Sequence, residues 1–224
     1  MLIVAIESST VAVSVALADV DGLVARFDAP RSRRHVETIM PALDSLLALV
    51  DHTRADISHL CVDVGPGMFT GLRVGVTTAI TLAYALNVPV VTVGSLELLA
   101  WRVALDGAFT GVIGAALDAR RKECFVEVFD VSPGTVSSIV PAATLSPPEA
   151  AEVLHGLDCG AVIGDGPQAY QDAFGGFLTM APFRPDAATA SVIALRRLAS
   201  AIDPGAVALR YIREPDAQIP KDLR

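Results

Sequence analysis

The sequence is poor in basic residues and in cysteine, and both shortages exclude classes of protein. Its 224 residues include 17 Lys and Arg against 25 Asp and Glu, a net charge of −8, which argues against a chain that wraps nucleic acid by itself. The three cysteines, Cys61, Cys124 and Cys159, are odd in number and widely spaced in apolar stretches. We therefore expect buried, reduced thiols.

Long hydrophobic runs and targeting signals are also missing. The longest apolar helix candidate, residues 74–86, is shorter than the ~20 residues that a bilayer crossing takes. Glu7 interrupts the apolar N-terminus and no basic segment precedes it, so no signal peptide is expected. Because 52% of the residues are hydrophobic, disorder is excluded and a sizeable core is predicted. We expect a soluble cytoplasmic protein.

Two further absences concern metal and nucleotide sites. The four histidines, at positions 35, 52, 59 and 155, have no ligand spacing between any pair, so we expect no metal site. The Gly-rich stretch 65–71 is not a Walker A loop, because no Lys-Ser or Lys-Thr follows Gly71. It does not match the dinucleotide pattern Gly-x-Gly-x-x-Gly either.

The chain is organised around this Gly-rich stretch. The sequence predicts a buried strand at residues 60–64, which ends at Gly65-Pro66-Gly67. A helix is predicted to follow, from Phe69 or Thr70 to residue 86, with Thr70 as its N-cap. A strand, a Gly-rich turn and a helix N-terminus present backbone N–H groups to an anion or to another backbone. Phosphate binding and close helix packing are both open, and the spacing favours packing.

The predicted strands and helices of the rest of the chain form two similar sets, one before and one after residue 107. Before residue 107, strands are predicted at 2–6, 11–18, 23–28 and 87–93 and helices at 32–50 and 95–105. After it, strands are predicted at 112–117, 123–129, 135–140 and 161–163 and helices at 149–157 and 189–202.

An offset of 111 residues relates the two parts of the chain. It places Asp118 on Glu7 and residues 124–128 on residues 13–17, which indicates internal duplication. Two such units predict a two-lobed α/β protein with a cleft between the lobes. Glu7, Asp118 and the glycine turns 65–67 and 164–166 should face this cleft, because α/β sites gather at the carboxyl ends of strands.

Several motifs in this order resemble the TsaB (YeaZ) family. They are Ala-Ile-Glu-Ser-Ser-Thr at 5–10, His35 with Pro41 in its helix, Gly-Pro-Gly-Met-Phe-Thr-Gly-Leu-Arg at 65–73, and Asp-Ala-Arg at 118–120. The stretch 65–73 is the specific element, and residues 164–166 and 211–213 also fit. The resemblance implies the α/β fold of actin and Hsp70-like ATPases (ASKHA), two duplicated ribonuclease-H-like lobes. Residues 1–106 would form the lobe with partner-binding helices and 107–224 the second lobe, whose last helix can pack back on the first.

The resemblance also implies a function. TsaB proteins are non-catalytic partners and activators of the TsaD threonylcarbamoyltransferase, which forms N6-threonylcarbamoyladenosine at position 37 of tRNAs, and TsaE joins the pair. The chain would then be no enzyme itself and would have no cofactor, with ATP or ADP only at the interface of the complex. It would reach tRNA through the complex, would form a homodimer in isolation and would not contact a membrane.

Two positions agree with a non-catalytic chain. TsaD-like enzymes hold a metal with two histidines four residues apart after the strand that follows the Gly-rich helix. Ser95 and Leu99 stand at the matching places here, and neither replaces an imidazole as a metal ligand. Actin-like ATPases carry an Asp where this chain has Glu7.

The candidate nucleotide or phosphate turns share glycines, hydroxyls and carboxylates at strand ends. They are Glu7, Ser8, Ser9, Thr10, Gly65, Gly67, Thr70, Gly71 and Asp118. A Glu can hold Mg²⁺ with a changed reach. The alternative is a hydrogen-bonded turn, because Ser and Thr bond nearby backbone readily.

The resemblance assigns partner binding to the two helices of the first lobe. The candidate residues are His35, Ile39, Met40, Leu43, Leu47, Leu72, Val76, Ile80 and Ala83. Among them, Met40, Leu43, Leu47, Val76, Ile80 and Ala83 are expected on the outward face. The alternative is that the apolar stripe is core.

Other functions remain open at this point. An autonomous small-molecule kinase or ATPase of the same fold needs an Asp base, for which Asp118 and Asp165 are available. A peptidase needs a nucleophile and a base, and Cys124 lies in a predicted strand near no placed histidine.

Overall fold

The computed structural model describes residues 1–32, 35–180 and 184–213, and these form two five-stranded sheets of one topology. The first sheet has the order β3-β2-β1-β4-β5, with β1 Leu2–Glu7, β2 Val13–Asp19, β3 Gly22–Ala29, β4 Ile57–Asp63 and β5 Val90–Val93. The second has the order β10-β9-β6-β7-β8, with β6 Gly111–Arg120, β7 Glu123–Ser132, β8 Thr135–Leu145, β9 Ala161–Ile163 and β10 Leu178–Thr179. In each sheet a three-stranded antiparallel meander is extended by two parallel strands. The predicted duplication is confirmed, and with it the actin-like two-lobed fold.

The strand register corrects one detail of the duplication. Glu7 lies opposite Ser14, and Asp118 lies opposite Cys124. Asp118 therefore corresponds to Glu7 with the offset of 111, but Cys124 corresponds to Ser14, an offset of 124 − 14 = 110. The second β-turn is thus one residue shorter, and the assignment of Cys124 to Val13 was wrong by one position.

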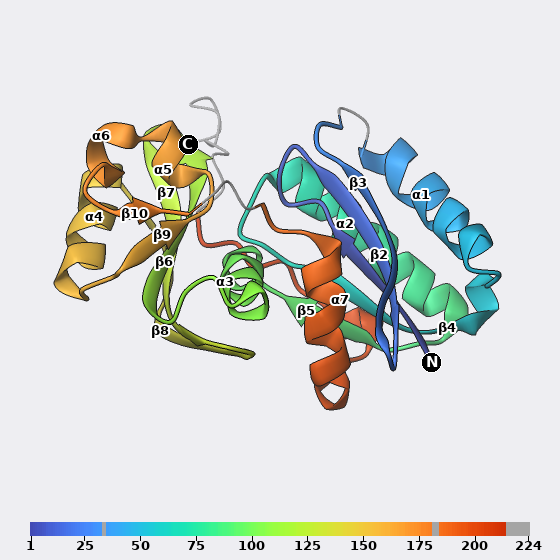
Figure 1. The fold of residues 1–224 in the computed structure, drawn as a ribbon. Helices are drawn as coiled ribbons and strands as arrows, with labels where there is room; N and C mark the ends of the chain where they lie inside the picture. Colours follow the sequence, from blue (N-terminus) through green and yellow to red (C-terminus); the bar gives the residue numbers. More distant parts are fainter. Residues whose placement is uncertain (33–34, 181–183, 214–224) are drawn as a thin grey trace, which may run out of the picture.

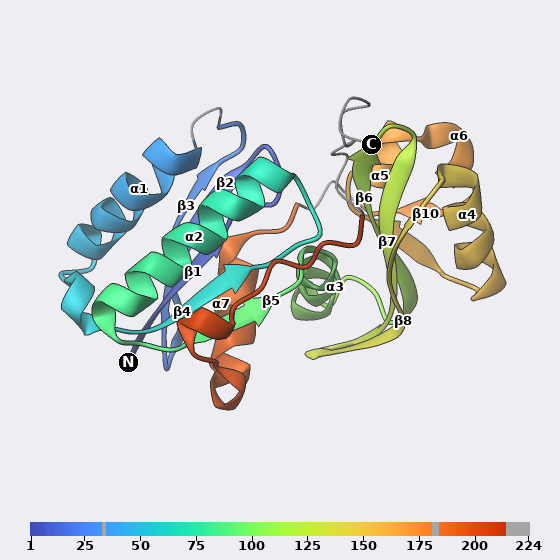
Figure 2. The ribbon, with the colours of Figure 1, turned by 180° about the vertical axis from the view of Figure 1, so that it is seen from behind.

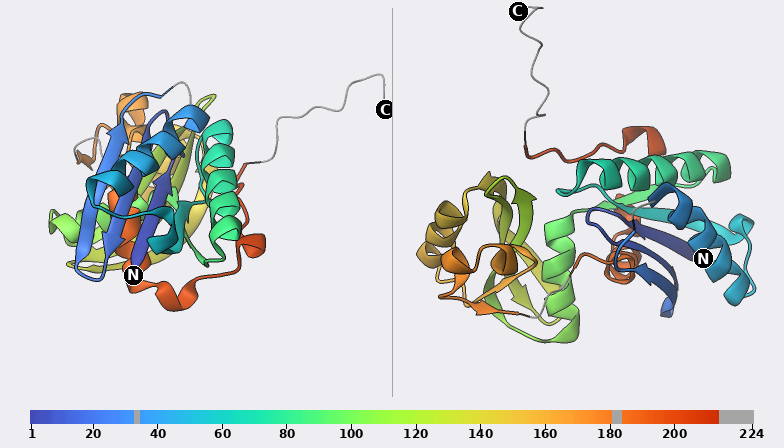
Figure 3. Two further views of the ribbon diagram at one scale, coloured as in Figure 1. Left: turned by 90° about the vertical axis from the view of Figure 1, so that its right-hand side faces the viewer. Right: turned by 90° about the horizontal axis from the view of Figure 1, so that it is seen from above.

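Helices cover both faces of the first sheet (Figures 1 and 3). The helices α1 (His35–Leu49) and α2 (Phe69–Leu86) pack on one face, where side chains of β1 and β2 such as Val4 and Val15 point. The helix α7 (Ala187–Arg196) packs on the other, against Ile3 and Ala16. Alternate residues of the strands therefore supply two different cores.

The helix α3 (Ser95–Asp106) joins the lobes, because it packs on α7 and also on β6, β7 and β8 of the second sheet. A single hydrophobic core runs through α3 and α7 from one sheet to the other. The outer face of the second sheet is covered by α4 (Pro147–Gly156), α5 (Gly166–Ala169) and α6 (Gln171–Phe174). Three short 3-10 turns complete the described elements: η1 Arg54–Asp56, η2 Leu198–Ser200 and η3 Pro204–Ala206.

Element boundaries differ from the predictions at both strand and helix ends: β8 extends to Leu145 rather than residue 140, and β5 begins at Val90 rather than residue 87. The helix α2 begins at Phe69 with Met68 as its N-cap, so the prediction of Thr70 as N-cap was wrong. The last helix ends at Arg196 rather than residue 202. By length and composition α2 is also apolar enough to cross a membrane, but its apolar face packs on the first sheet. All three cysteines are buried free thiols.

After α7 the chain returns along the first lobe to the second. Val90 and Ile202 exchange backbone hydrogen bonds of 2.8 and 2.9 Å, and Val207 and Leu209 pack against the core beneath α2. We call residues 201–213 the C-terminal strap. Figure 2 shows it beside α2 and β4 before it reaches the second sheet.

Candidate functional site

The carboxyl end of β1 holds a buried pair of acids. Glu7 is fully buried, and its Oε1 accepts hydrogen bonds from the Ser9 N–H at 2.6 Å and from the Ser9 hydroxyl. Its Oε2 is buried and makes no hydrogen bond to a described residue. Asp63, at the end of the adjacent parallel strand β4, accepts from the Ser95 hydroxyl at 2.7 and 2.9 Å and from the Gly65 N–H at 2.8 Å.

Burial decides the charge of this pair. Burial, followed by repulsion from Asp63, raises the pKa of Glu7 well above its usual value. Burial also raises the pKa of Asp63 to about 6, although hydrogen bonds from Ser95 and Gly65 oppose it. Burial therefore favours the protonated form of Glu7 more than in a free glutamate. Because Mg²⁺ binds the ionised carboxylate, the raised pKa makes Glu7 a weaker match for the role of the Asp in actin-like ATPases.

The hydroxyls of the β1–β2 turn are engaged within the protein. The Ser8 hydroxyl donates to the Gly71 carbonyl at 2.9 Å, and the Thr10 Oγ1 accepts from the Ala12 N–H at 3.1 Å. Among the turn's carbonyls, that of Ser9 accepts from the Met68 N–H at 2.6 Å, and that of Thr10 accepts from His35 Nε2 at 3.1 Å. These contacts support the alternative of a hydrogen-bonded turn.

The glycines after β4 bring the start of α2 directly onto this turn. A Cβ on Gly67 would lie 2.4 Å from the Ser9 carbonyl oxygen, and one on Gly71 would lie 2.1 Å from that of Ser8. One on Gly75 would lie 2.2 Å from the Ser8 hydroxyl. Gly65 has a φ of +105° and also lies against Leu72 and the strap. The glycines therefore serve close packing of the helix on the turn, while Thr70 is exposed beside them.

The turn after β6 in the second lobe corresponds to the β1–β2 turn, and its polar groups are also bonded within the protein. Asp118 accepts from the Tyr170 hydroxyl at 2.8 Å and from the Arg120 N–H at 2.8 Å, and its own N–H donates to Asp165 at 2.9 Å. Burial and the bond to Asp118 raise the pKa of Tyr170 to about 12. A Cβ on Gly164 would lie 2.1 Å from the Ala116 carbonyl. Both Asp118 and Asp165, the candidate kinase bases, are thus held by internal donors.

The two predicted acidic turns do not form one site. The hydrogen-bond partners of Glu7 come from the first lobe and those of Asp118 from the second. Because Glu7 is fully buried, the expectation that it faces an open cleft was wrong. Burial of this position depends on α2 and β4, which lie far from it in sequence.

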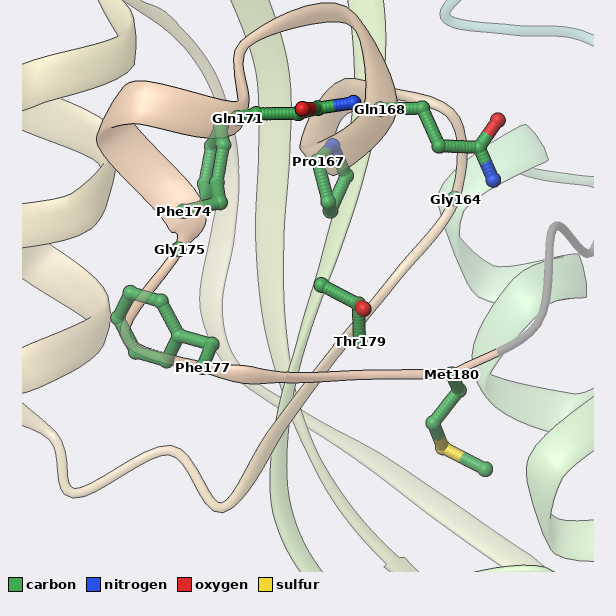
Figure 4. Close-up of a pocket in the computed structure, with 9 residues that line it drawn as sticks. All are labelled: Gly164, Pro167, Gln168, Gln171, Phe174, Gly175, Phe177, Thr179 and Met180. Atoms are coloured by element: carbon green, nitrogen blue, oxygen red, sulfur yellow. The ribbon is translucent and has the colours of Figure 1, made fainter.

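Two cavities lie in the second lobe. One of about 400 Å³ is shown in Figure 4 and is lined by Gly164, Pro167, Gln168, Gln171, Phe174, Gly175, Phe177, Thr179 and Met180. Another, of about 740 Å³, lies between α4 and the segment Gln168–Ala173. Among the described residues, no charged side chain lines the first cavity and only Asp172 lines the second. Neither cavity was predicted, because the walls come from short helices without a periodic sequence pattern.

The structure corrects the partner-binding residues on α1 and α2. Six of them are buried, and all but Leu72 belong to the core beneath these helices: Ile39, Leu43, Leu47, Leu72, Val76 and Ala83. The outward-face assignment was therefore wrong for Leu43, Leu47, Val76 and Ala83, because the stripe at helical spacing packs on the sheet. His35, Met40 and Ile80 are half-buried.

A different stripe faces outward on α2. It consists of Phe69, Arg73, Thr77, Ile80 and Tyr84, at intervals of three or four residues. Tyr84 is 59% and Phe69 49% exposed. Arg73 lies over the Phe69 ring, 3.8 Å from its centroid, and donates to the Tyr211 hydroxyl of the strap at 3.3 Å. We call these five residues the α2 stripe.

A metal centre finds no support in the described part of the chain. Ser95 is bound to Asp63, and Leu99 is buried in the core between the sheets. Within residues 1–32, 35–180 and 184–213, no three His, Cys, Asp or Glu side chains are grouped so as to hold a metal ion.

Comparison with known proteins agrees with this fold. Residues 29–169 match the family model described as "TsaD: tRNA N6-adenosine threonylcarbamoyltransferase". The chain is 37% identical over 141 residues to the tRNA threonylcarbamoyladenosine biosynthesis protein TsaB of Bacillus subtilis, a match covering 63% of this chain and 60% of that protein. It is 35% identical over 125 residues to TsaB of Escherichia coli, covering 56% of this chain and 53% of that protein. The chain thus spans little more than half the length of these relatives.

A solved structure extends the likeness to nearly the whole chain. An uncharacterized Pseudomonas aeruginosa protein with similarity to the peptidase YeaZ superposes with a TM-score of 0.81 at 24% identity. The match covers 95% of this chain and 99% of that one, so the two share a fold.

Proposed function

This chain belongs to the TsaB (YeaZ) group of the TsaD family, and we propose that it is a non-catalytic partner of a TsaD threonylcarbamoyltransferase. In this proposal the pair forms N6-threonylcarbamoyladenosine at position 37 of tRNAs in the cytoplasm. TsaE joins the complex, tRNA is bound through the complex, and ATP or ADP binds only at its interface.

One observation carries the non-catalytic part of the proposal. The start of α2 is pressed onto the β1–β2 turn, with a Gly71 Cβ position 2.1 Å from the Ser8 carbonyl. In an ATPase of this fold the corresponding turn has to receive phosphate groups, whereas here it is occupied by the protein's own helix. The raised pKa of Glu7 supports the same conclusion, because burial disfavours the ionised carboxylate that would attract Mg²⁺.

The partner surface in this proposal is the outer side of α1 and α2. The α2 stripe offers two exposed aromatic side chains, Phe69 and Tyr84, with the small Thr77 between them. On α1, Val36 is exposed and Met40 is half-buried. A stable interface buries about 1,600 Å² in total, and two adjacent helices can supply the surface for it. The same surface serves self-association when the partner is absent.

Reconstitution tests the proposal directly. Unmodified tRNA is incubated with TsaC, TsaD, TsaE, ATP, threonine and bicarbonate, with and without this chain, and threonylcarbamoyladenosine is measured per tRNA. We expect the yield to depend on the chain, while the chain alone turns over no ATP. Equal yields without the chain would refute the activator role. Steady ATP turnover by the isolated chain would favour the small-molecule kinase instead.

A further inference from the structure

The strand β3 forms an open edge of the first sheet. It is the outermost strand of that sheet, and within residues 1–32, 35–180 and 184–213 no strand pairs with its outer side. Three large hydrophobic side chains of β3, those of Leu23, Val24 and Phe27, are exposed. An edge of this kind offers backbone N–H and C=O groups, together with apolar side chains, to another extended chain.

The other sheet edges carry features that discourage such pairing. The β5 edge is covered by the strap, through the hydrogen bonds between Val90 and Ile202. The strand β10 is only two residues long, and β8 contains Pro141, which has no N–H to donate. Covered edges, short strands and prolines are common protections of an edge. The strand β3 has eight residues and contains no proline, so it is the edge best suited to pairing.

The ladder between β2 and β3 limits the part of β3 that can pair. Val24 is left out of this ladder as a bulge, because the residues on either side of it lie opposite consecutive residues of β2. Pro30 follows the strand at its other end. The regular segment of β3 is therefore 25–29, and its middle residue is Phe27.

Two opposite charges lie on either side of Phe27. Arg26 and Asp28 are exposed, and Arg26 Nε lies 3.3 Å from Asp28 Oδ2. The other carboxylate oxygen of Asp28 accepts from the Ser14 hydroxyl at 2.8 Å, which holds this side chain in place. Both charges therefore project beside the open edge at fixed positions along the strand.

This order of charges is complementary to itself. Two identical strands that pair antiparallel are related by a two-fold axis, so each residue lies opposite the one equally far on the other side of the axis. With the axis at Phe27, Arg26 of each copy lies opposite Asp28 of the other. An axis one residue away would place Arg26 opposite Arg26, or Asp28 opposite Asp28, and like charges directly opposite are destabilising.

We infer that β3 pairs antiparallel with β3 of a second copy of this chain, with the two-fold axis at Phe27. The two Phe27 side chains meet on one face of the joined sheet, and the charges of Arg26 and Asp28 alternate in sign on the other. A single short strand buries less than about 1,200 Å², so the pair is weak and reversible. This contact is separate from self-association through α1 and α2 and does not depend on it.

Crosslinking tests the position of the axis. Phe27→Cys places two Cβ atoms about 5 Å apart across the axis, whereas Val24→Cys separates them by about six residues of strand, roughly 20 Å. The three native cysteines are buried, so a short bismaleimide should join two chains through the new thiols. We expect a covalent dimer with Phe27→Cys and about tenfold less with Val24→Cys.

Three further substitutions, each combined with Phe27→Cys, identify the contact. Arg26→Asp puts a carboxylate opposite Asp28 of the second copy and should reduce the crosslinked yield about tenfold. Arg54→Asp is the matched control, because it also removes an exposed arginine that is paired with a carboxylate. Thr77→Arg places a large cation in the α2 stripe. Both Arg54→Asp and Thr77→Arg should change the yield by less than about twofold, and circular dichroism checks that each variant is folded.

Several results would overturn the inference. They are equal yields at the two cysteine positions, no dimer with Phe27→Cys, an equal loss in Arg54→Asp, or loss of the dimer in Thr77→Arg. A wild-type chain that stays monomeric in sedimentation from micromolar to millimolar concentration would also overturn it, and would leave β3 as an edge for an extended segment of another protein.

A charge exchange gives a second test that needs no cysteine. Chains with Arg26→Asp and chains with Asp28→Arg should each sediment as monomers, because like charges then lie opposite one another. An equal mixture of the two should associate, because every opposed pair in the mixed dimer has unlike charges. Folded variants that fail to associate when mixed would overturn the inference.

Discussion

The guanidinium of Arg210 in the C-terminal strap lies 3.7 Å from the carboxylate of Glu127 in β7 of the second sheet. Glu127 is almost fully buried in β7, and its Oε1 accepts from the Ser138 hydroxyl at 2.8 Å. The Arg210 N–H donates to the Val64 carbonyl beside the first sheet at 2.8 Å. Arg210 of the strap thus contacts both lobes, and the hydrophobic core around α3 also connects them.

Removing this guanidinium should destabilise the protein. In Arg210→Ala the Glu127 carboxylate would stay buried without its cation, and burial already raises its pKa. Because the Arg210 side chain is 42% exposed, water screens the pair, and we expect a loss of about 1 to 2 kcal/mol in the free energy of unfolding. Urea denaturation measures this loss.

A second substitution shows whether Glu127 is the cause. Arg210→Ala with Glu127→Gln should be less destabilised than the sum of the two single variants, because the neutral amide needs no cation. Additive losses would contradict a coupling between these two side chains.

The stability of the protein should fall as the pH rises from about 4 through 6. The pKa values of Glu7 and Asp63 are raised in the folded protein, that of Asp63 to about 6, so the folded state binds more protons than the unfolded state from about pH 4 upward. Stability therefore decreases through pH 6 and beyond, by an amount on the order of 2 kcal/mol between pH 5 and pH 8. The pKa values of Asp56 and Glu149 are lowered. These two groups therefore make the stability rise with pH, but only at lower pH.

Urea unfolding across this pH range, for the wild type and for Glu7→Gln, measures the effect. The amide cannot ionise, so the variant should show a flatter dependence above pH 6. A wild type whose stability is level or rises between pH 5 and pH 8 would contradict the raised pKa values of Glu7 and Asp63.

A methyl group at Gly71 should be far more harmful than one at Gly156. The Cβ of Gly71→Ala would meet the Ser8 carbonyl at 2.1 Å, and backbone is not free to move away, so we expect a loss of about 3 kcal/mol or more. Gly156 is the last residue of α4, and a Cβ there meets nothing within 4 Å. Gly156→Ala should therefore be neutral or slightly stabilising. Thermal unfolding of both variants checks the pair, and a tolerated Gly71→Ala would show that the turn and the helix are not closely packed.

Substitutions on α1 and α2 should separate folding from partner binding. Leu43 is fully buried, so Leu43→Asp should unfold the protein, because a carboxylate in this core has no partner. Thr77 is exposed in the middle of the α2 stripe, so Thr77→Arg should prevent assembly with TsaD and leave the fold intact.

Circular dichroism and size-exclusion chromatography with TsaD provide the two readouts. Ser137→Arg, an equally large change at an exposed position of β8 in the second lobe, is the control and should still assemble. Normal assembly of the folded Thr77→Arg variant would place the partner surface elsewhere.

The sequence by itself determined the elements that depend on neighbours along the chain. Alternation and helical spacing placed the strands, the turn at Gly65 and the helix beginning at Phe69, and repetition of this pattern revealed the two lobes. Missing ligand spacings, at Ser95 and Leu99 for example, argued against a metal site without any coordinates. These features are local, because backbone angles and side-chain periodicity are set within a few residues.

Only the tertiary structure decided which groups meet. The helical stripe that includes Leu43 could have faced a partner or the sheet, and packing against β2 placed it inside. The raised pKa of Glu7 depends on burial beneath α2 and on Asp63, 56 residues away in the chain (63 − 7). The link between Arg210 and Glu127 joins residues 83 positions apart in the chain (210 − 127). Such relationships depend on how elements distant in the chain pack together, and neither spacing nor composition records that arrangement.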